Sequence, residues 1–268
     1  MDSARLPVVP LTSTHDLTAL HRDVLSPSFP PAELVHLDDF LGGHATGRSR
    51  SVGVVSDGAV VAGAVGSWSA TSGVLLLEYL AIAPGHRGGG IGSRLLTAAL
   101  DEWQATLDPV LVLAEVEHPG HHDASEAHGD PSARLRFYAR HGARVLPVPY
   151  FQPGNAPGAP RVPALLLMVL RSAEPEASSV PAGPVRVFLE ELLVAAEGVV
   201  ADDEATRALL DAVSGDRVEL VEPADLDRAR VPVAELDAAT AHAPQTAWAG
   251  SPDPSATDPG ASASTGPA

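Results

Sequence analysis

The sequence predicts a mixed α/β fold with a mainly antiparallel sheet that contains one parallel strand pair. Two strand patterns flank Asp57-Gly58, the dipeptide most typical of a tight β-hairpin. A third strand pattern runs into a glycine-rich turn and a helix, and a continuous apolar strand follows that helix. A strand reached through a helical crossover runs parallel to the strand before the crossover. These observations predict an antiparallel three-stranded meander joined to a parallel neighbour.

For the segment before the hairpin, the sequence predicts an edge strand and two helices. Leu6–Leu11 contains two prolines, which suits a strand at the edge of a sheet. A capped helix follows and ends at about Leu25. Pro31–Leu41 has a second helical pattern, which Gly42-Gly43 is expected to close. The two helices should form one wall above the sheet.

The other elements of the main domain follow in a clear order. They are the strands Ser51–Ser56, Ala59–Trp68 and Gly73–Ile82, a helix from Ile91 to about Thr106, the strand Pro109–Glu117, the helix Ser132–His141, and the strands Ala143–Pro147 and Val162–Leu170. Pro109–Glu117 is almost continuously apolar, as expected of a strand buried on both faces. It should therefore lie parallel to Gly73–Ile82 near the centre of the sheet.

Composition changes after residue 171. Residues 1–171 are expected to form the main domain, and 172–184 a Pro/Ser/Gly/Glu linker. Residues 185–240 have two amphipathic helical patterns and predict a helical extension that serves as a lid or packing layer, with a homodimer contact as the second choice. Residues 241–268 are rich in Pro, Ala, Ser, Thr and Gly and predict a disordered tail.

Charge and residue usage exclude several classes of function. The formal net charge is −17, with 16 acidic and 12 arginine residues up to position 171 and 18 acidic and 5 arginine residues after it. This balance argues against nucleic acid or an anionic membrane as a partner, because both require basic surface. Cysteine is absent, which excludes disulfides and a thiol nucleophile. Neither a signal peptide nor an apolar run of membrane-spanning length is found, so we expect a cytoplasmic protein.

The glycine-rich turn has the features of a phosphate-binding site. Arg87-Gly88-Gly89-Gly90-Ile91-Gly92 lies between a strand and the start of a helix, where unpaired backbone N–H groups and the helix dipole attract anions. The spacing differs from the GxxxxGK[ST] motif of nucleotide triphosphatases. It also lacks the GxGxxG spacing and the acidic ribose partner of dinucleotide-binding turns.

Two motifs at matching positions resemble the GNAT N-acetyltransferase superfamily. Arg87, Gly90 and Gly92 match its Arg/Gln-x-x-Gly-x-Gly/Ala acyl-CoA loop. Residues 136–142 resemble its Phe/Leu-Tyr-x-x-x-Gly helix, and the predicted element order is the GNAT order. The resemblance covers about Leu6–Arg171 and implies acetyl-CoA as co-substrate, bound where the two central parallel strands splay apart.

The resemblance also implies the residues that bind acetyl-CoA. The diphosphate would contact the turn, chiefly through backbone N–H groups, at Arg87, Gly88, Gly89, Gly90, Ile91, Gly92 and Ser93. The pantetheine amides would pair with Leu80, Ala81 and Ile82, and the N–H of Leu80 would face the thioester oxygen. No asparagine stands where the family often has one that contacts CoA, and Ser132 is a candidate substitute.

Candidate acid and base residues follow from the same resemblance. Glu115 is ranked first as general base, because Ala114-Glu115-Val116 matches the last two positions of the Leu-Glu-Val of ribosomal-protein N-terminal acetyltransferases. Glu117 and Glu78 follow in that order, and each glutamate is as readily assigned a structural or substrate-orienting role. A carboxylate at the end of an apolar strand should have a raised pKa, which improves it as a base. Tyr138 is the candidate acid for the leaving thiolate, with an ordinary helix tyrosine as the alternative.

The segment after the central strand is less informative. The histidines at 118, 121, 122 and 128 raise the possibility of a zinc site, but the surrounding Gly and Pro favour a solvated loop beside the acceptor site, so no metal is expected. Tyr150-Phe151-Gln152-Pro153 is a candidate acceptor-side segment, with core packing its equal rival.

The expected activity is acetyl transfer from acetyl-CoA to a primary amine. The absence of cysteine and of a Ser/His/Asp motif favours direct transfer in a ternary complex over a covalent acyl-enzyme. The acidic candidate residues favour a cationic acceptor, either a small molecule or a peptide amine. The alternatives are a non-catalytic acyl-CoA-binding module and a transferase of a longer acyl chain.

Overall fold

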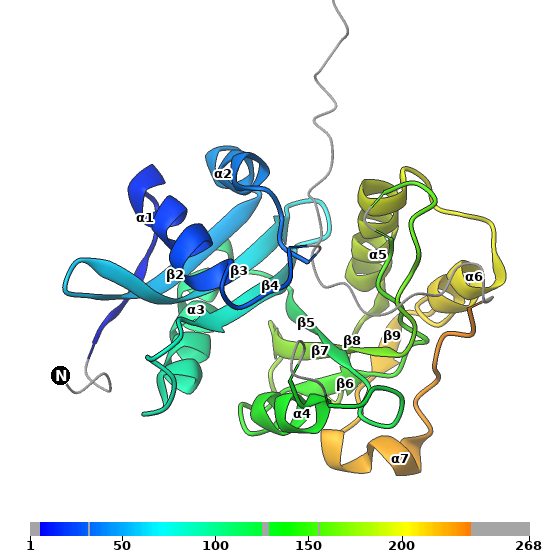
Figure 1. Ribbon diagram of the computed structural model, residues 1–268. Coiled ribbons are helices and arrows are strands. Elements are labelled where there is room, and N and C mark those ends of the chain that lie inside the picture. Colours follow the sequence, from blue (N-terminus) through cyan, green and yellow to red (C-terminus); the bar gives the residue numbers. More distant parts are fainter. Residues whose placement is uncertain (1–5, 32, 125–128, 155, 237–268) are drawn as a thin grey trace, which may run out of the picture.

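The computed structural model describes residues 6–31, 33–124, 129–154 and 156–236. Within these ranges, the main sheet has seven strands in the order β1–β2–β3–β4–β5–β7–β6 (Figure 1). The strands are β1 (Val8–Pro10), β2 (Ser49–Ser56), β3 (Ala59–Ser69), β4 (Val74–Ile82), β5 (Leu111–Glu117), β6 (Arg144–Leu146) and β7 (Leu165–Ser172). The pairs are antiparallel except for β4 and β5, which are parallel. The predicted mixed sheet with one parallel pair is therefore confirmed.

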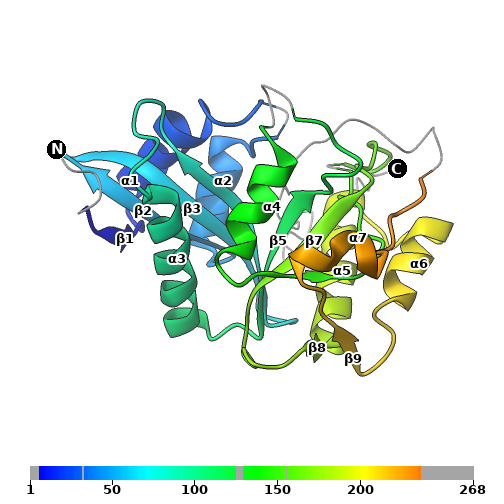
Figure 2. The ribbon, with the colours of Figure 1, turned by 90° about the horizontal axis from the view of Figure 1, so that it is seen from below.

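Helices cover both faces of this sheet. They are α1 (Thr14–Ala19) with a π-helical continuation (Leu20–Leu25), α2 (Leu37–Ala45), α3 (Ile91–Leu107), α4 (Pro131–Ala139), α5 (Ala182–Glu197), α6 (Glu204–Asp211), the 3₁₀ turn Pro223–Asp225 and α7 (Leu226–Ala229). The apolar side chains of α3 and α4 pack on one face, and those of α1, α2 and α5 on the other (Figures 1 and 2). The result is a sheet buried between two helical layers.

The β2–β3 hairpin has the turn that its sequence predicts. Asp57 and Gly58 both have positive φ angles, 51° and 80°, as a two-residue type I′ turn requires. Glycine adopts this conformation without strain, and aspartate tolerates it better than most residues do.

The predicted boundaries of the second helix are wrong at both ends. The helix α2 begins at Leu37 rather than Pro31, and it continues through both glycines to Ala45. Gly43 does not end the helix but allows close packing, because a Cβ there would lie 2.5 Å from Oγ of Ser49 on β2. A local glycine signal cannot distinguish a helix end from a close contact with a distant strand.

The C-terminal extension forms a layer on the sheet. Buried apolar side chains of α5, including Phe188 and Leu189, pack in one cluster with Leu76, Leu113 and Leu167 of the sheet. The predicted linker 172–184 contains β8 (Ser179–Pro181) and the first turn of α5, and β8 pairs with β9 (Arg217–Glu219) in a second small sheet. The predicted tail, 241–268, lies outside the described residues.

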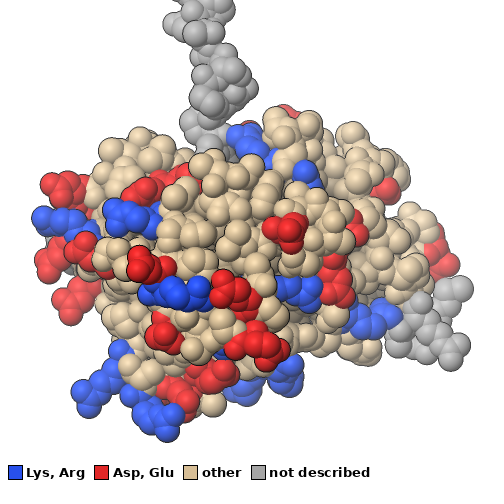
Figure 3. Space-filling view, turned by 180° about the vertical axis from the view of Figure 1, so that it is seen from behind, with Lys and Arg blue, Asp and Glu red and all other residues tan. Residues whose placement is uncertain are grey.

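Charged side chains of both signs lie on the surface of the molecule (Figure 3). One face of the molecule shows arginine and carboxylate side chains interspersed across it (Figure 3). In the part of the chain that the structure describes, none of the helices combines the length and the apolar character needed to cross a bilayer.

Candidate active site

The central parallel strands pair over only part of their length. The β4–β5 register runs from Val74↔Leu111 to Leu77↔Ala114 and stops there. Beyond this point β4 stays paired with β3 as far as Ile82, and β5 stays paired with β7 as far as Glu117. The two strands therefore separate at their carboxyl ends, and a cleft of about 390 Å³ lies at the separation.

A β-bulge at Glu78 coincides with the start of this separation. On β3, Val65 pairs with Tyr79 and the next residue, Gly66, pairs with Leu77, so Glu78 is the extra residue of β4. Leu77 consequently packs with the α3 layer, whereas Tyr79, two positions later, packs with the α1–α2 layer. The bulge reverses the alternation of β4 at the point where the candidate acid–base residue lies.

Most of the predicted site residues lie along the cleft. The lining residues that the sequence predicted are Glu78, Leu80, Ala81, Ile82, Arg87, Gly92, Glu115, Glu117 and Tyr138. The lining residues that it did not predict are Ser28, Phe29, Glu33, Leu77, Arg134 and Phe137. The first three come from the segment before α2, whose sequence has no recognisable binding or catalytic motif. Arg134 could have been found, since it lies four residues before Tyr138 on the same helical face.

Glu115 is held by two polar side chains from the segment that precedes β7. The hydroxyl of Tyr150 donates a hydrogen bond to Oε1, and Nε2 of Gln152 donates one to Oε2 at 3.1 Å. Burial raises the pKa of Glu115, and the two hydrogen bonds oppose this rise because they stabilise the carboxylate. The segment Tyr150–Pro153, for which the sequence left acceptor binding and core packing as equal alternatives, thus contacts the candidate base.

Glu78 has the properties of a proton acceptor near neutral pH. Burial, followed by repulsion from Glu115, raises its pKa to about 8, and a hydrogen bond with Ser67 partly offsets the rise. Two carboxylates that repel each other take up and release protons as a coupled pair. Glu78 and Glu115 are each half-buried, so the pair adjoins the cleft while its charges remain poorly solvated.

Glu117 differs from these two glutamates. It is only 4% exposed, and its Oε2 lies 3.4 Å from Nη1 of Arg134 on α4. The contact with Arg134 restricts the orientation of the Glu117 side chain. This arrangement suits an orienting role better than proton transfer.

Tyr138 projects from α4 into the same cleft. Its side chain is 7% exposed, and burial raises its pKa to about 12, with the nearby Arg134 guanidinium acting in the opposite direction. The phenol therefore keeps its proton throughout the physiological pH range, as a proton donor must.

The glycine-rich turn is open and left-handed. Gly88, Gly89 and Gly90 have φ angles of 102°, 59° and 74°, and a Cβ built on any of them meets no atom within 4 Å. No side chain caps α3, whose first-turn N–H groups follow directly. Ser93 in this turn contacts His141 through its hydroxyl at 3.1 Å. Of the predicted loop residues, Arg87 and Gly92 reach the cleft, while Gly88, Gly89 and Gly90 form its exposed continuation.

The histidine segment contacts its own backbone and the residues just before β7. Nδ1 of His118 accepts a hydrogen bond from the N–H of Gly120, and the ring of His122 lies 3.0 Å from the carbonyl of Pro163. No group of three or more His, Asp or Glu side chains that could hold a metal is found in the described ranges, and His128 lies outside them.

The raised pKa of Glu78 predicts that the protein loses stability as the pH rises. A carboxyl whose folded-state pKa is raised from 4.5 to about 8 contributes its full stability below pH 4.5 and loses it as the pH rises through 8. Glu78→Gln stays neutral, so its Tm relative to wild type should increase between about pH 5 and about pH 9. Thermal unfolding followed by circular dichroism measures this, with Glu174→Gln, an exposed carboxyl, as the control. The same pH dependence in Glu78→Gln and wild type would contradict the raised pKa.

The sheet thus opens between its parallel strands, beside a glycine-rich helix start that has no side-chain cap. Residues 48–142 match the family model described as an acetyltransferase (GNAT) domain. Among solved structures, the chain is similar to a protein assigned to the GNAT acetyltransferases from Bacteroides thetaiotaomicron, with a TM-score of 0.52 and 23% identity over 72% of this chain and 99% of that one.

The ribosomal-protein-S18-alanine N-acetyltransferase from Escherichia coli aligns less closely, with a TM-score of 0.43 and 19% identity over 61% of this chain and 91% of that one. No curated protein matches the sequence. The match of residues 48–142 to this domain confirms the resemblance to the GNAT superfamily that was inferred from the sequence. It supports acyl-CoA-dependent acetyl transfer as the general class of reaction.

Proposed function

We propose that the protein transfers an acetyl group directly from acetyl-CoA to a primary amine. The observation that carries the proposal is the cleft between the separated strands, which adjoins a glycine-rich turn and is lined by Glu78, Glu115 and Tyr138. Binding, deprotonation of the amine and protonation of the leaving thiolate are the requirements of this reaction, and residues suited to each border the same space.

The acyl donor would occupy the gap between β4 and β5. The edge of β4 beyond Leu77 has no β5 partner, so its backbone groups are available to the amides of pantetheine. The diphosphate would contact the N–H groups from Arg87 to Ser93, where the open glycines leave room for phosphate oxygens. The N–H of Leu80 is the candidate donor to the thioester oxygen.

The coupled glutamates would take the proton from the amine. A base accepts a proton at less cost when its pKa is raised toward that of an alkyl ammonium ion, and burial raises the pKa of Glu115 and, to about 8, that of Glu78. Attack of the neutral amine on the thioester carbonyl then forms the amide bond, and the thiolate leaves. Tyr138, which is protonated at neutral pH, would return a proton to the thiolate.

The acceptor is proposed to be cationic. Three glutamates line the cleft, and the field of those that are ionised favours an ammonium group over a neutral or anionic one. Glu33, which is 3% exposed, adds a fourth carboxyl from the segment before α2. Amino sugars, polyamines and peptide amines share this chemistry.

An acetyl-CoA consumption screen tests the proposal. The purified protein is incubated with acetyl-CoA and each class of amine, and free thiol release is followed together with the mass of the acetylated product. Saturable release that depends on an amine supports the proposal. Tight CoA binding without transfer to any amine class would favour a non-catalytic acyl-CoA-binding module. Faster thiol release from longer acyl-CoA substrates than from acetyl-CoA would favour a transferase of a longer acyl chain.

Glutamine substitutions should rank the three glutamates. We expect Glu115→Gln and Glu78→Gln to lower kcat by about 100-fold or more, because each removes a member of the proton-accepting pair. Glu117→Gln should act mainly on KM for the amine, since Glu117 is paired with Arg134. Raised base pKa values predict that kcat/KM of the wild type increases with pH up to about 8. A pH-independent kcat/KM, or full activity of both Glu78→Gln and Glu115→Gln, would contradict this assignment.

A further inference from the structure

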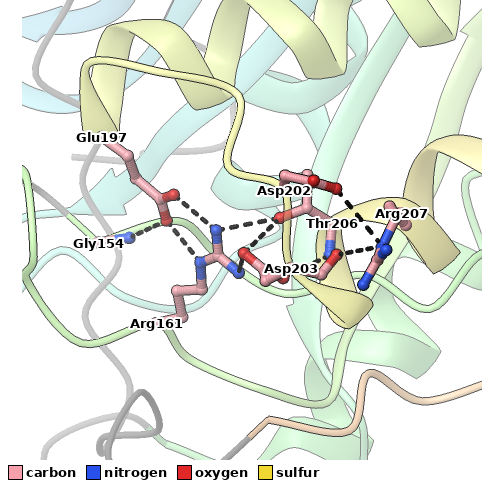
Figure 4. Close-up of polar contacts among 7 residues, drawn as sticks. All are labelled: Gly154, Arg161, Glu197, Asp202, Asp203, Thr206 and Arg207. Carbon is pink, nitrogen blue, oxygen red and sulfur yellow. Dashed lines mark hydrogen bonds and ion pairs between the residues drawn. The ribbon is translucent and has the colours of Figure 1, made fainter.

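A buried arginine links the C-terminal extension to the segment that holds Glu115. Arg161 is 6% exposed and lies in the connection that leads into β7. Its Nε and Nη2 donate to the two carboxylate oxygens of Glu197, both at 2.7 Å, and its Nη1 donates to Asp203 at 2.9 Å (Figure 4). Nη2 also donates to Oγ1 of Thr206, a residue that is 1% exposed. The guanidinium thus joins the last residue of α5 to the start of α6.

The same arginine contacts the segment 150–154. Its guanidinium lies 4.4 Å from the ring centroid of Phe151, which stands between Tyr150 and Gln152 in the sequence. Gln152 and Val162, the neighbour of Arg161, exchange two backbone hydrogen bonds of 2.9 and 3.0 Å.

Glu197 provides a second link between the extension and this segment. It accepts a hydrogen bond from the N–H of Gly154 at 3.3 Å while it pairs with Arg161 (Figure 4). One continuous set of contacts therefore runs from α5 and α6 through Arg161 to the backbone of Gln152.

From these contacts, we propose that Arg161 is a positioning residue for Glu115, acting through the segment that carries Tyr150 and Gln152. The inference rests on the proposed function insofar as Glu115 is a base. It assigns the C-terminal extension a part in the active site although the cleft is lined only by residues up to Tyr138.

The geometry favours this role over stability alone. A buried guanidinium with two carboxylates is costly to desolvate, and such a network is a weak source of net stability compared with apolar packing. It does define one orientation, because the fork of the guanidinium matches the Glu197 carboxylate at two points. That orientation restricts Phe151, and hence the hydrogen-bond donors on either side of it.

The expected consequence is electrostatic. Repulsion from Glu115 contributes to the raised pKa of Glu78 and of Tyr79 on β4, while the Glu115 carboxylate itself is stabilised by the hydrogen bonds from Tyr150 and Gln152. If the donors Tyr150 and Gln152 move away, the Glu115 carboxylate loses its stabilising hydrogen bonds and its pKa should rise further.

The test compares Arg161→Met and Arg161→Lys with a matched ion-pair control. Arg161→Met keeps an unbranched apolar stem and removes the guanidinium. Arg161→Lys keeps the charge without the two-point contact and serves if the first variant fails to fold. Arg171→Met is the control: it removes an arginine of β7 whose ion-pair partner, at 2.8 Å, is Asp101 on α3. Each variant is assayed well below its own Tm.

Two readouts separate positioning from a merely structural role. The titration of the Glu115 carboxyl is followed by ¹³C NMR of glutamate-labelled protein, assigned by Glu115→Gln, and needs no substrate. The second readout is kcat/KM against pH. In both Arg161 variants, the titration of Glu115 should move to higher pH. The value of kcat/KM should be about tenfold below that of wild type near pH 6.5, and within about twofold of wild type near pH 9.

The outcomes are distinct. Arg161 variants that lower Tm but leave the Glu115 titration and the pH profile unchanged would overturn the proposal, and so would an equal change in Arg171→Met. A moved titration in a protein that acetylates no amine would contradict the proposed function while supporting the positioning role of Arg161.

Discussion

Gly90→Glu is expected to weaken the binding of CoA by about 100-fold or more, equivalent to about 2.8 kcal/mol. The substitution introduces a carboxylate where the diphosphate should meet the first turn of α3, and like charges at that separation repel each other. Isothermal titration calorimetry with CoA measures the effect directly. Since no amine is involved, the result does not depend on the identity of the acceptor.

The hairpin supplies a matched control for this variant. Gly58 has a left-handed φ of 80°, close to the 74° of Gly90, and an added Cβ at either position meets no atom within 4 Å. Gly58→Glu therefore introduces the same charge and a similar backbone strain of about 1–2 kcal/mol, in a turn between β2 and β3. The control should bind CoA within about twofold of wild type. Equal affinities for the two variants would refute the assignment of the phosphate site.

Tyr138→Phe is expected to lower kcat by about 100-fold or more while leaving the Kd for CoA within about twofold of wild type. The substitution removes only the hydroxyl, so the aromatic ring continues to fill its position between α4 and the sheet. Without the phenol, the thiolate must leave unprotonated or take its proton from water. Steady-state kinetics with the best amine from the screen, together with CoA calorimetry, measure the two quantities.

Tyr79→Phe distinguishes loss of catalysis from loss of a buried hydroxyl. The Tyr79 hydroxyl donates to the backbone carbonyl of Glu33 at 3.1 Å and accepts from the N–H of Val35 at 3.3 Å. Its removal should cost about 1 kcal/mol of stability, with a much smaller effect on kcat than that of Tyr138→Phe. Turnover of Tyr138→Phe equal to that of wild type would remove Tyr138 from the mechanism.

Local patterns predicted the elements of the main domain well. The apolar face of α3, with Leu95, Leu96, Ala99, Leu100 and Trp103, is buried as its helical period predicts. The parallel pairing of β4 with β5 follows from the crossover between them, because chain connectivity and the handedness of the crossover leave few alternatives. Such features depend on residues close together in sequence, where periodicity and turn chemistry are informative.

Contacts between distant segments were less accessible to prediction. The hydrogen bonds from Tyr150 and Gln152 to Glu115 join residues 35 and 37 positions apart, and no local pattern marks them. The sequence ranked Glu78 below Glu115 and Glu117 and did not reveal the bulge at Glu78, because strand register cannot be read from sequence. A bulge arises from the register with the neighbouring strand and leaves no clear signal in its own strand.

The sequence by itself determined the order of the elements, the resemblance to the GNAT superfamily and the position of the glycine-rich turn, because these depend on short-range geometry that a few residue types dictate. Only the tertiary structure decided which carboxylates share the cleft, how far each is desolvated, and that the extension after residue 171 reaches Glu115 through Arg161. The physical reason is that pKa values and side-chain orientation depend on burial and on partners brought together by folding, and neither is encoded in the neighbours along the chain.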